Sequence, residues 1–90
     1  MSGKDNGSVP HGPRGKALAY LRGELPRGYR GAAEKTIRDA LGTNGSPVKF
    51  DYPNGTIAIE RAPGKMPDVL IFSDVILTVE NYFERIKNLT

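Results

Sequence analysis

Arginine followed by glycine is the recurrent motif of this 90-residue chain, and its copies are concentrated in the N-terminal half. Four copies fall within 18 residues, at Arg14-Gly15, Arg22-Gly23, Arg27-Gly28 and Arg30-Gly31, and Tyr29 lies between the last two. A guanidinium group binds phosphate oxygens through several N–H donors, and a neighbouring glycine lets the backbone approach a phosphate closely. A tyrosine ring can stack on an unpaired base. The motif is therefore typical of a surface that contacts nucleic acid.

The charge distribution favours the same hypothesis. Residues 1–42 carry a formal charge of +4, whereas residues 43–90 carry −1. Such an asymmetry indicates a polyanionic partner for the basic half. Our candidate nucleic-acid-binding residues are Arg14, Lys16, Arg22, Arg27, Tyr29, Arg30, Lys35 and Arg38. Two alternatives remain open: the same arginines bind an acidic protein surface, or they are solvated and the glycines simply end helices.

Side chains for catalysis or metal binding are scarce. The chain has no cysteine, and its single histidine, His11, lies in the N-terminal segment. A nucleophilic serine or threonine needs a nearby base, and a structural zinc site needs several cysteines or histidines. Glu80 and Glu84 are one helical turn apart on a face expected to be solvated, so they do not suggest an acid–base pair. We expect a non-enzymatic binding module without a cofactor or metal.

The segment 47–61 predicts a β-hairpin, and the rest of the chain must pack on its apolar face. Its two halves alternate apolar and polar residues, and they meet at Asn54-Gly55, which is typical of a two-residue hairpin turn. One face is then aromatic and aliphatic, and the other carries an ion pair. The expected cross-strand pairs are Val48 with Arg61, Lys49 with Glu60, Phe50 with Ile59, Asp51 with Ala58, and Tyr52 with Ile57.

Two helices are expected before the hairpin. Apolar residues recur at helical spacing in 15–25, which Pro26 follows, and again in 32–41, which Gly42 follows as a left-handed cap. In the second helix, Glu34 and Arg38 have the spacing of an ion pair. Residues 1–13 hold too little apolar surface to fold, so we expect a disordered tail and a single domain over 14–90.

The C-terminal segment has two interpretations. In the first, residues 69–72 form a third strand buried on both faces, and Ser73 or Asp74 begins a helix that runs to Leu89. In the second, one helix runs from Asp68 onward. Under either interpretation, the apolar side of the last helix is an alternative site that binds another protein or forms a homodimer. Its candidate residues are Phe72, Ile76, Val79, Phe83 and Ile86.

The first interpretation predicts an α+β fold, in which a small antiparallel sheet packs against two N-terminal helices and one C-terminal helix. From Ala32 onward the order α-β-β-β-α is also that of double-stranded RNA-binding domains, and the second interpretation resembles a dimerising winged-helix module. Residues 73–78 lack the basic cluster of the first family, and the second family has three helices before its wing, so we assign no family. The absence of a long apolar run predicts a soluble, cytoplasmic protein that does not bind membranes.

Overall fold

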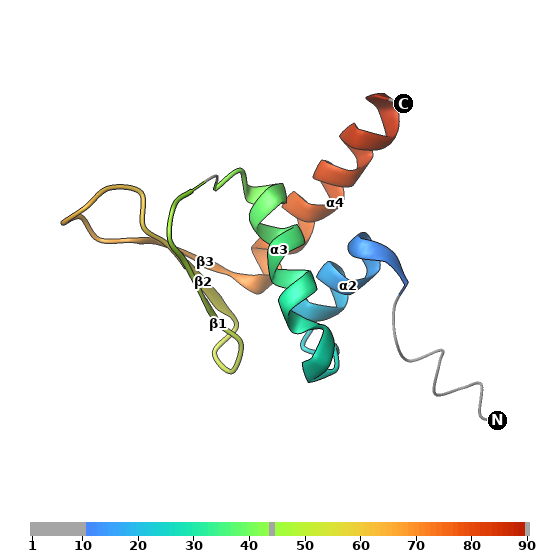
Figure 1. Cartoon of the computed structure of the whole chain (residues 1–90), viewed down its shortest axis with the longest axis horizontal. Helices are drawn as coiled ribbons and strands as arrows, with labels where there is room; N and C mark the ends of the chain where they lie inside the picture. The colour runs from blue at the N-terminus through green and yellow to red at the C-terminus, as the bar shows by residue number, and fades with distance from the viewer. Residues whose placement is uncertain (1–10, 44, 90) are drawn as a thin grey trace.

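The computed structural model describes residues 11–43 and 45–89, which form helices and a three-stranded antiparallel sheet (Figure 1). The elements are α2 (Gly12–Leu21), the 3-10 helix η1 (Arg27–Tyr29), α3 (Arg30–Leu41), β1 (Val48–Asp51), β2 (Thr56–Ile59), β3 (Asp68–Ile71) and α4 (Phe72–Leu89). The α+β class is confirmed, and so is the interpretation in which a strand precedes the last helix. None of the helices in the described residues is long and apolar enough to cross a membrane.

The predicted hairpin is present, but its register differs from the predicted one by two residues. Phe50 lies across from Ile57, where we expected Ile59, and Val48 lies across from Ile59, where we expected Arg61. Because side chains alternate with a period of two, this shift keeps every residue on its predicted face. The remaining predicted pairs are also wrong: Lys49 lies across from Ala58 rather than Glu60, Asp51 lies across from Thr56 rather than Ala58, and Tyr52 lies in the loop.

Pro53 explains the longer loop. A two-residue turn at Asn54-Gly55 would pair Pro53 with Thr56 and would require an N–H group that proline lacks. Instead, the chain turns through residues 52–55, with Gly55 alone in the left-handed region at φ 69°. The Gly55 amide donates to the Asp51 carbonyl at 2.8 Å. The Asp51 carboxylate accepts from the Asn54 backbone at 3.2 Å and from its side-chain amide at 2.8 Å.

The third strand is one residue earlier than predicted, and it is not buried on both faces. The sheet order is β1-β2-β3, so β3 is an edge strand. Leu70 faces the core beside Ile57, whereas Val69 and Ile71 point to the other face and are 61% and 49% exposed. An antiparallel sheet needs cover on one face only, which leaves its outer apolar residues in solvent. Phe72, expected to end the strand, instead begins α4 and is buried.

The ring of Tyr20 lies at the centre of the core and is fully buried. Its centroid is 5.1–5.7 Å from those of Tyr52, Phe72 and Phe50, so it joins α2 to the hairpin and to the start of α4. Edge-to-face aromatic contacts of this kind add about 0.5–1.5 kcal/mol beyond the burial of area. The other large, fully buried side chains come from α3, β2 and α4: Ile37, Ile57, Ile59, Val75 and Val79.

The first helix begins and ends earlier than predicted. Pro13 lies in its first turn, where the backbone N–H group that proline lacks would have no partner within the helix. After the helix, Gly23 adopts a left-handed conformation at φ 75°, so the helix does not continue. Leu25 is therefore outside the helix, yet it is buried. The second helix starts at Arg30, two residues before the predicted start, and Gly42 is confirmed as its left-handed cap at φ 68°. Of the predicted tail, residues 1–10 lie outside the described residues, whereas residues 12 and 13 belong to α2.

Candidate nucleic-acid interface

The solvent side of α3 carries the most prominent group of predicted basic residues. Ala33, Ile37 and Ala40 face the core, so the helical repeat turns Lys35 and Arg38 to the opposite side, where both are exposed. Arg27 of η1 directly precedes this helix and is exposed as well. We call the surface formed by Arg27, Arg30, Lys35 and Arg38 the α3 face.

Two arginines of the α3 face lie over aromatic rings of the hairpin. The guanidinium carbon of Arg30 is 3.7 Å from the centroid of the Tyr52 ring, and that of Arg38 is 5.7 Å from the Phe50 ring. Cation–π contacts of this kind contribute about 0.5–2 kcal/mol, and they hold a planar guanidinium in one orientation. The Nε atom of Arg30 is buried and has no hydrogen-bond partner among the described residues. The hairpin rings beneath them therefore restrict the orientation of these two cations, Arg30 more closely than Arg38.

The side chain of Glu34, in the middle of α3, is directed toward Tyr20 in the core. Its carboxylate accepts a hydrogen bond of 2.9 Å from the Tyr20 hydroxyl, and the predicted ion pair of Glu34 with Arg38 does not form. Burial raises the pKa of the Tyr20 hydroxyl well above its usual value, and the hydrogen bond to Glu34 and its charge act in the same direction. The acid therefore supports the core instead of neutralising the surface cations.

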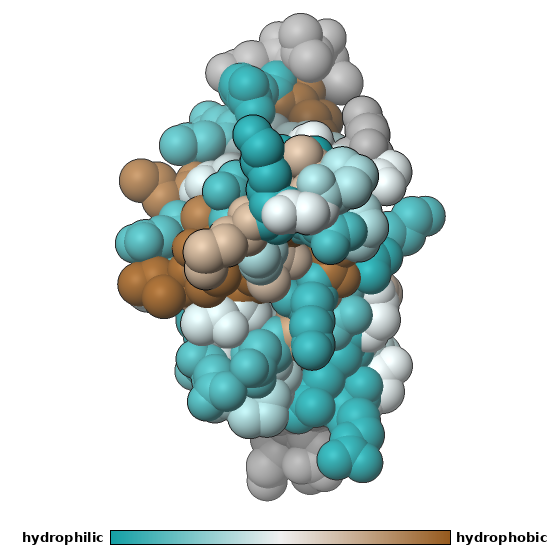
Figure 2. Space-filling model, turned by 90° about the vertical axis from the view of Figure 1, so that its left-hand side faces the viewer, coloured by the Kyte–Doolittle hydropathy of each residue, from teal (hydrophilic) through white to brown (hydrophobic). Residues whose placement is uncertain are grey.

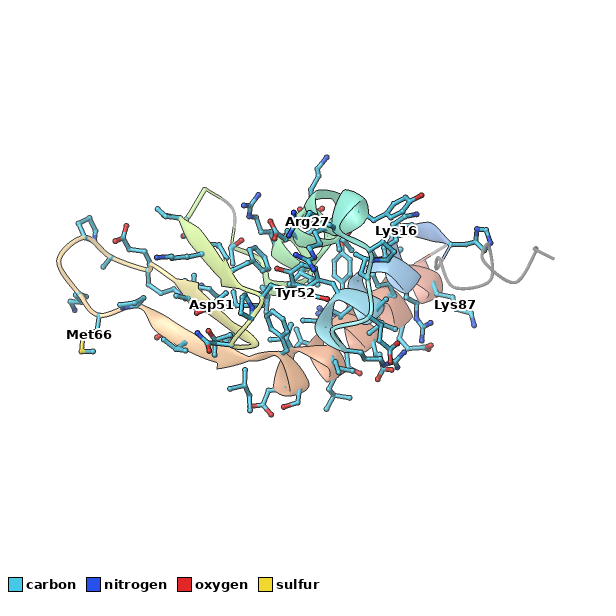
Figure 3. All side chains as sticks on the ribbon, turned by 90° about the horizontal axis from the view of Figure 1, so that it is seen from below. Lys16, Arg27, Asp51, Tyr52, Met66 and Lys87 are labelled. Atoms are coloured by element: carbon cyan, nitrogen blue, oxygen red, sulfur yellow. The ribbon has the colours of Figure 1, made fainter. Side chains whose placement is uncertain are left out.

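Helix α2 extends the basic surface at its start. The Lys16 ammonium lies 5.6 Å from the centroid of the Tyr29 ring, and this ring is 41% exposed. In Figure 3, Lys16 and Arg27 lie on the side of the molecule where α3 runs. Arg14 is exposed on α2. The aromatic of the predicted set is thus exposed and has a cation over its ring.

Arg22 lies apart from the α3 face. It follows α2 and lines a shallow hollow of about 410 Å³ together with the β1–β2 turn and the start of α4. A second hollow, of about 230 Å³, lies at the other end of the α3 face, between Lys35, Arg38 and Ser46. The structure therefore brings together most of the predicted cations but places Arg22 at the margin.

None of these cations forms an ion pair within the described chain, although the exposed Asp39 lines the same hollow as Lys35 and Arg38. Arg14, Arg22, Arg27 and Lys35 form no ion pair with another described residue. The ion pair between Arg61, which follows β2, and Asp68 of β3 has an N–O distance of 3.0 Å. In residues 11–43 and 45–89, no three histidine or acidic side chains gather as a metal site would require.

Most residues of the alternative site on the last helix pack in or against the core. Phe72 and Val79 are buried, Ile76 and Phe83 are half-buried against the core, and Ile86 is 38% exposed. The Tyr82 and Phe83 rings pack edge to face at 5.1 Å. The apolar side of α4 thus faces α2 and α3 over most of its length.

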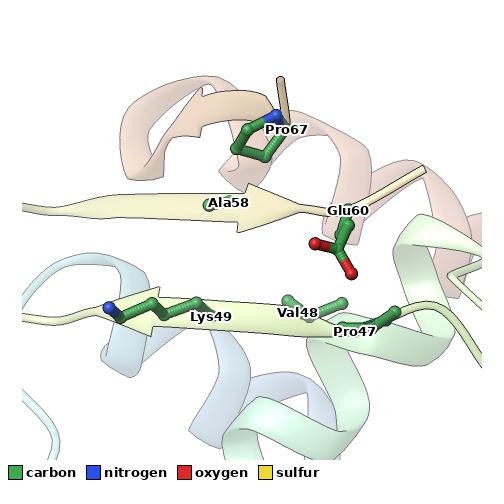
Figure 4. A pocket seen from close by; sticks show the side chains of 6 residues that line it. All are labelled: Pro47, Val48, Lys49, Ala58, Glu60 and Pro67. Carbon is green, nitrogen blue, oxygen red and sulfur yellow. The ribbon is translucent and has the colours of Figure 1, made fainter. Parts of the chain in front are cut away.

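The sequence interpretation missed two surface features. Tyr52 was predicted on the apolar face of the hairpin, but not the contact of its ring with Arg30; the cue was a tyrosine next to the turn, which is too weak to predict a specific contact. The second feature is a small hollow of about 240 Å³ on the outer face of the sheet, lined by apolar side chains including Pro47 and Pro67 (Figure 4). Lys49 and Glu60 stand at its rim, and in Figure 4 the lysine side chain points away from the glutamate.

Neither a protein-family model, nor a curated protein, nor a solved structure matches this chain. The case for a function therefore rests on the chemistry and geometry of its own residues.

Proposed function

We propose that this protein is a non-enzymatic module that binds nucleic acid through the α3 face, with Lys16, Tyr29 and Arg14 extending the surface. The observation that supports this proposal most strongly is the group of exposed cations on one side of η1 and α3 that form no ion pair with the described chain. Binding to phosphates releases the counterions that such cations and the nucleic acid hold in solution, which drives association at low salt.

The support beneath the cations favours phosphate contacts over simple solvation. An arginine that is only solvated keeps the freedom of a long side chain, and this freedom is lost on binding. The contact of Arg30 with Tyr52 removes part of this cost in advance, and the planar guanidinium suits phosphate oxygens. The N-terminus of α3 has no side-chain cap and no acid in its first turn, so it adds a positive dipole end beside Arg27.

The test is a pair of charge-matched variants. Arg27→Ala with Lys35→Ala removes two exposed cations from the α3 face, and Lys49→Ala with Arg85→Ala removes two exposed cations from elsewhere. Binding to labelled mixed-sequence RNA and DNA is followed by fluorescence anisotropy at several salt concentrations. For each phosphate contact that the first variant removes, the slope of log K against log salt should flatten by about 0.7–0.9, and binding should weaken roughly tenfold at about 50 mM salt.

The control variant should keep both the affinity and the slope close to those of the parent protein. Equal losses of affinity in the two variants would mean that only net charge matters and that the α3 face has no special role. An absence of binding at about 50 mM salt and micromolar protein would contradict the proposal outright, since non-specific cationic modules bind under those conditions.

A further inference from the structure

The edge of the sheet opposite the α3 face is an unpaired strand. In the described part of the chain β3 pairs with β2 only, so the N–H and C=O groups along its other edge have no strand partner. Figure 3 shows β3 at the side of the sheet away from α3. Natural edge strands are usually short, or carry a charged side chain, a proline or a bulge that prevents pairing with another chain. Residues 68–71, Asp-Val-Leu-Ile, form a short strand without lysine, proline or bulge, and their one charged side chain, Asp68, is paired with Arg61.

Two of the three exposed side chains of β3 are apolar, and the third is that of Asp68. Val69 is 61% exposed and Ile71 is 49% exposed, and both point to the outer face, where Ala58 of β2 lies beside Val69. Figure 2 shows apolar surface gathered at one edge of the molecule between hydrophilic regions. Exposed aliphatic groups beside free backbone groups are the features by which a strand recruits another strand.

We propose that β3 pairs antiparallel with β3 of a second copy of this chain, which joins two sheets into one of six strands. Centred on Leu70, this pairing places Val69 of one copy across from Ile71 of the other, on the same outer face. The two Leu70 side chains then meet on the core side. Every exposed aliphatic group of the strand thereby gains an aliphatic neighbour.

The charges that flank β3 favour a second copy over an unrelated strand. Lys65 lies before the strand and Asp74 lies in the first turn of α4 after it, and neither forms an ion pair with another described residue. An antiparallel arrangement brings the end with Lys65 in each copy to the end with Asp74 in the other. Asp68, which would otherwise add a like charge at the pairing edge, is already neutralised by Arg61 at 3.0 Å. The segments that flank the edge are therefore complementary in charge between two antiparallel copies.

The short length of β3 limits the expected affinity of the dimer. A stable interface buries about 800 Å² on each partner, which a strand of four residues does not reach through its backbone edge alone. We therefore expect a dimer that forms and dissociates with concentration, and that contributes little to the fold of each copy.

Sedimentation velocity on the full chain between about 10 μM and 1 mM tests the oligomeric state, since even weak association is populated at the upper limit. The mass should rise from 9.8 kDa toward twice that value. Val69→Lys should leave the protein monomeric, because it places like charges at the pairing edge. Thr78→Lys, which adds the same charge at an exposed position of α4, should leave the dimer intact. Circular dichroism checks that both variants stay folded.

A charge swap tests the partner and the direction of the strands. Lys65→Glu and Asp74→Lys should each weaken the dimer, and the double variant should restore it, because opposite charges then face each other again. The proposal is overturned by a protein that is monomeric at about 1 mM, by a dimer that persists in Val69→Lys, or by a double variant that does not recover. A dimer disrupted by Ile86→Asp but not by Val69→Lys would place the contact on α4 instead.

Discussion

The α3 face and the β3 edge are both exposed, but they are built differently. The cations of the α3 face stand on a helix and are partly held by aromatic rings of the hairpin, whereas β3 presents aliphatic side chains and unpaired backbone groups. A surface of oriented, unpaired cations suits a flexible polyanion, and a free apolar edge suits another strand. Because β1 and β3 are the two outer strands of the sheet, the two surfaces lie on opposite edges and do not compete.

Placing the two surfaces on opposite edges affects the expected affinity. Two copies joined through β3 would carry their α3 faces at the outer ends of one assembly. A nucleic acid long enough to reach both faces would bind the second one at a raised effective concentration, without any new contact. A short oligonucleotide would gain nothing from dimerisation.

The largest expected effect comes from the central strand, which joins the two edges. Ile59 of β2 is fully buried, so Ile59→Ala should lower the free energy of unfolding by about 2–5 kcal/mol. Both surfaces should weaken together, because each depends on the same sheet. Chemical denaturation measures the loss, and Glu60→Ala at the neighbouring exposed position should change stability by less than about 0.5 kcal/mol. A mild effect at Ile59 would mean that the edges are supported separately.

Tyr20 links the two regions through its ring and its hydroxyl, and this link should depend on pH. The raised pKa means that Tyr20 keeps its proton above pH about 10, where an unfolded tyrosine loses its own. The unfolded state then binds fewer protons, so stability should be fully present below that pH and fall by up to about 1.4 kcal/mol per unit as the pH rises above it.

The variant Tyr20→Phe should remove this part of the alkaline fall, while Tyr29→Phe at the exposed ring should keep it. Denaturation curves measured between pH 8 and pH 11, a range chosen around the usual tyrosine value of about 10, make the comparison. An identical pH profile in the parent protein and in Tyr20→Phe would show that the hydroxyl does not couple α2 to Glu34.

The arginines of the α3 face should differ in how much each contributes to the stability of the fold. Arg30→Ala removes the cation over Tyr52 and should cost about 0.5–2 kcal/mol of stability, whereas Arg27→Ala should be nearly silent. Both changes should weaken nucleic-acid binding. Arg30→Lys keeps the charge without the planar stack, so it should keep only part of the stability. Thermal unfolding measures the difference, and equal melting temperatures for the two alanine variants would contradict it.

The smallest effect is expected at the β1–β2 turn. Asp51→Ala removes the acceptor of two hydrogen bonds from Asn54 in an exposed turn and should cost about 0.5–1.5 kcal/mol. The turn contacts the end of β3 from the β2 side, where Gly55 accepts a hydrogen bond from the Phe72 amide at 2.8 Å, and it does not form the free edge. Dimerisation should therefore be unchanged. Denaturation and sedimentation on the same variant check both statements, and a failure to dimerise would show that the turn and the β3 edge are coupled.

The fold was largely predictable because its main signals are local. Alternation and the Asn-Gly dipeptide predicted the hairpin and its faces, and the 3.6-residue repeat with Gly42 predicted α3. The register was not predictable from the turn dipeptide alone, since Pro53 excludes the two-residue loop that Asn-Gly otherwise favours. The burial of β3 was overestimated because a short apolar run looks the same in a central strand and in an edge strand.

The candidate site was predictable in composition and not in geometry. Residue type and charge selected the basic half, and four of the eight predicted residues share the α3 face. The contact of Arg30 with Tyr52 depends on how α3 packs against the hairpin, which no local pattern encodes. The exposure of Val69 and Ile71 depends on the order of strands in the sheet, which is equally non-local.

The most direct test of the central claim is an NMR titration of the isotope-labelled protein with a single short oligonucleotide at about 50 mM salt, where phosphate contacts are strong. We predict that the amide signals of residues 27–38 shift with added oligonucleotide, that raising the salt reverses these shifts, and that the signals of residues 68–71 stay in place. Shifts confined to residues 68–71 or to α4, or no shifts at all, would contradict the assignment of nucleic-acid binding to the α3 face.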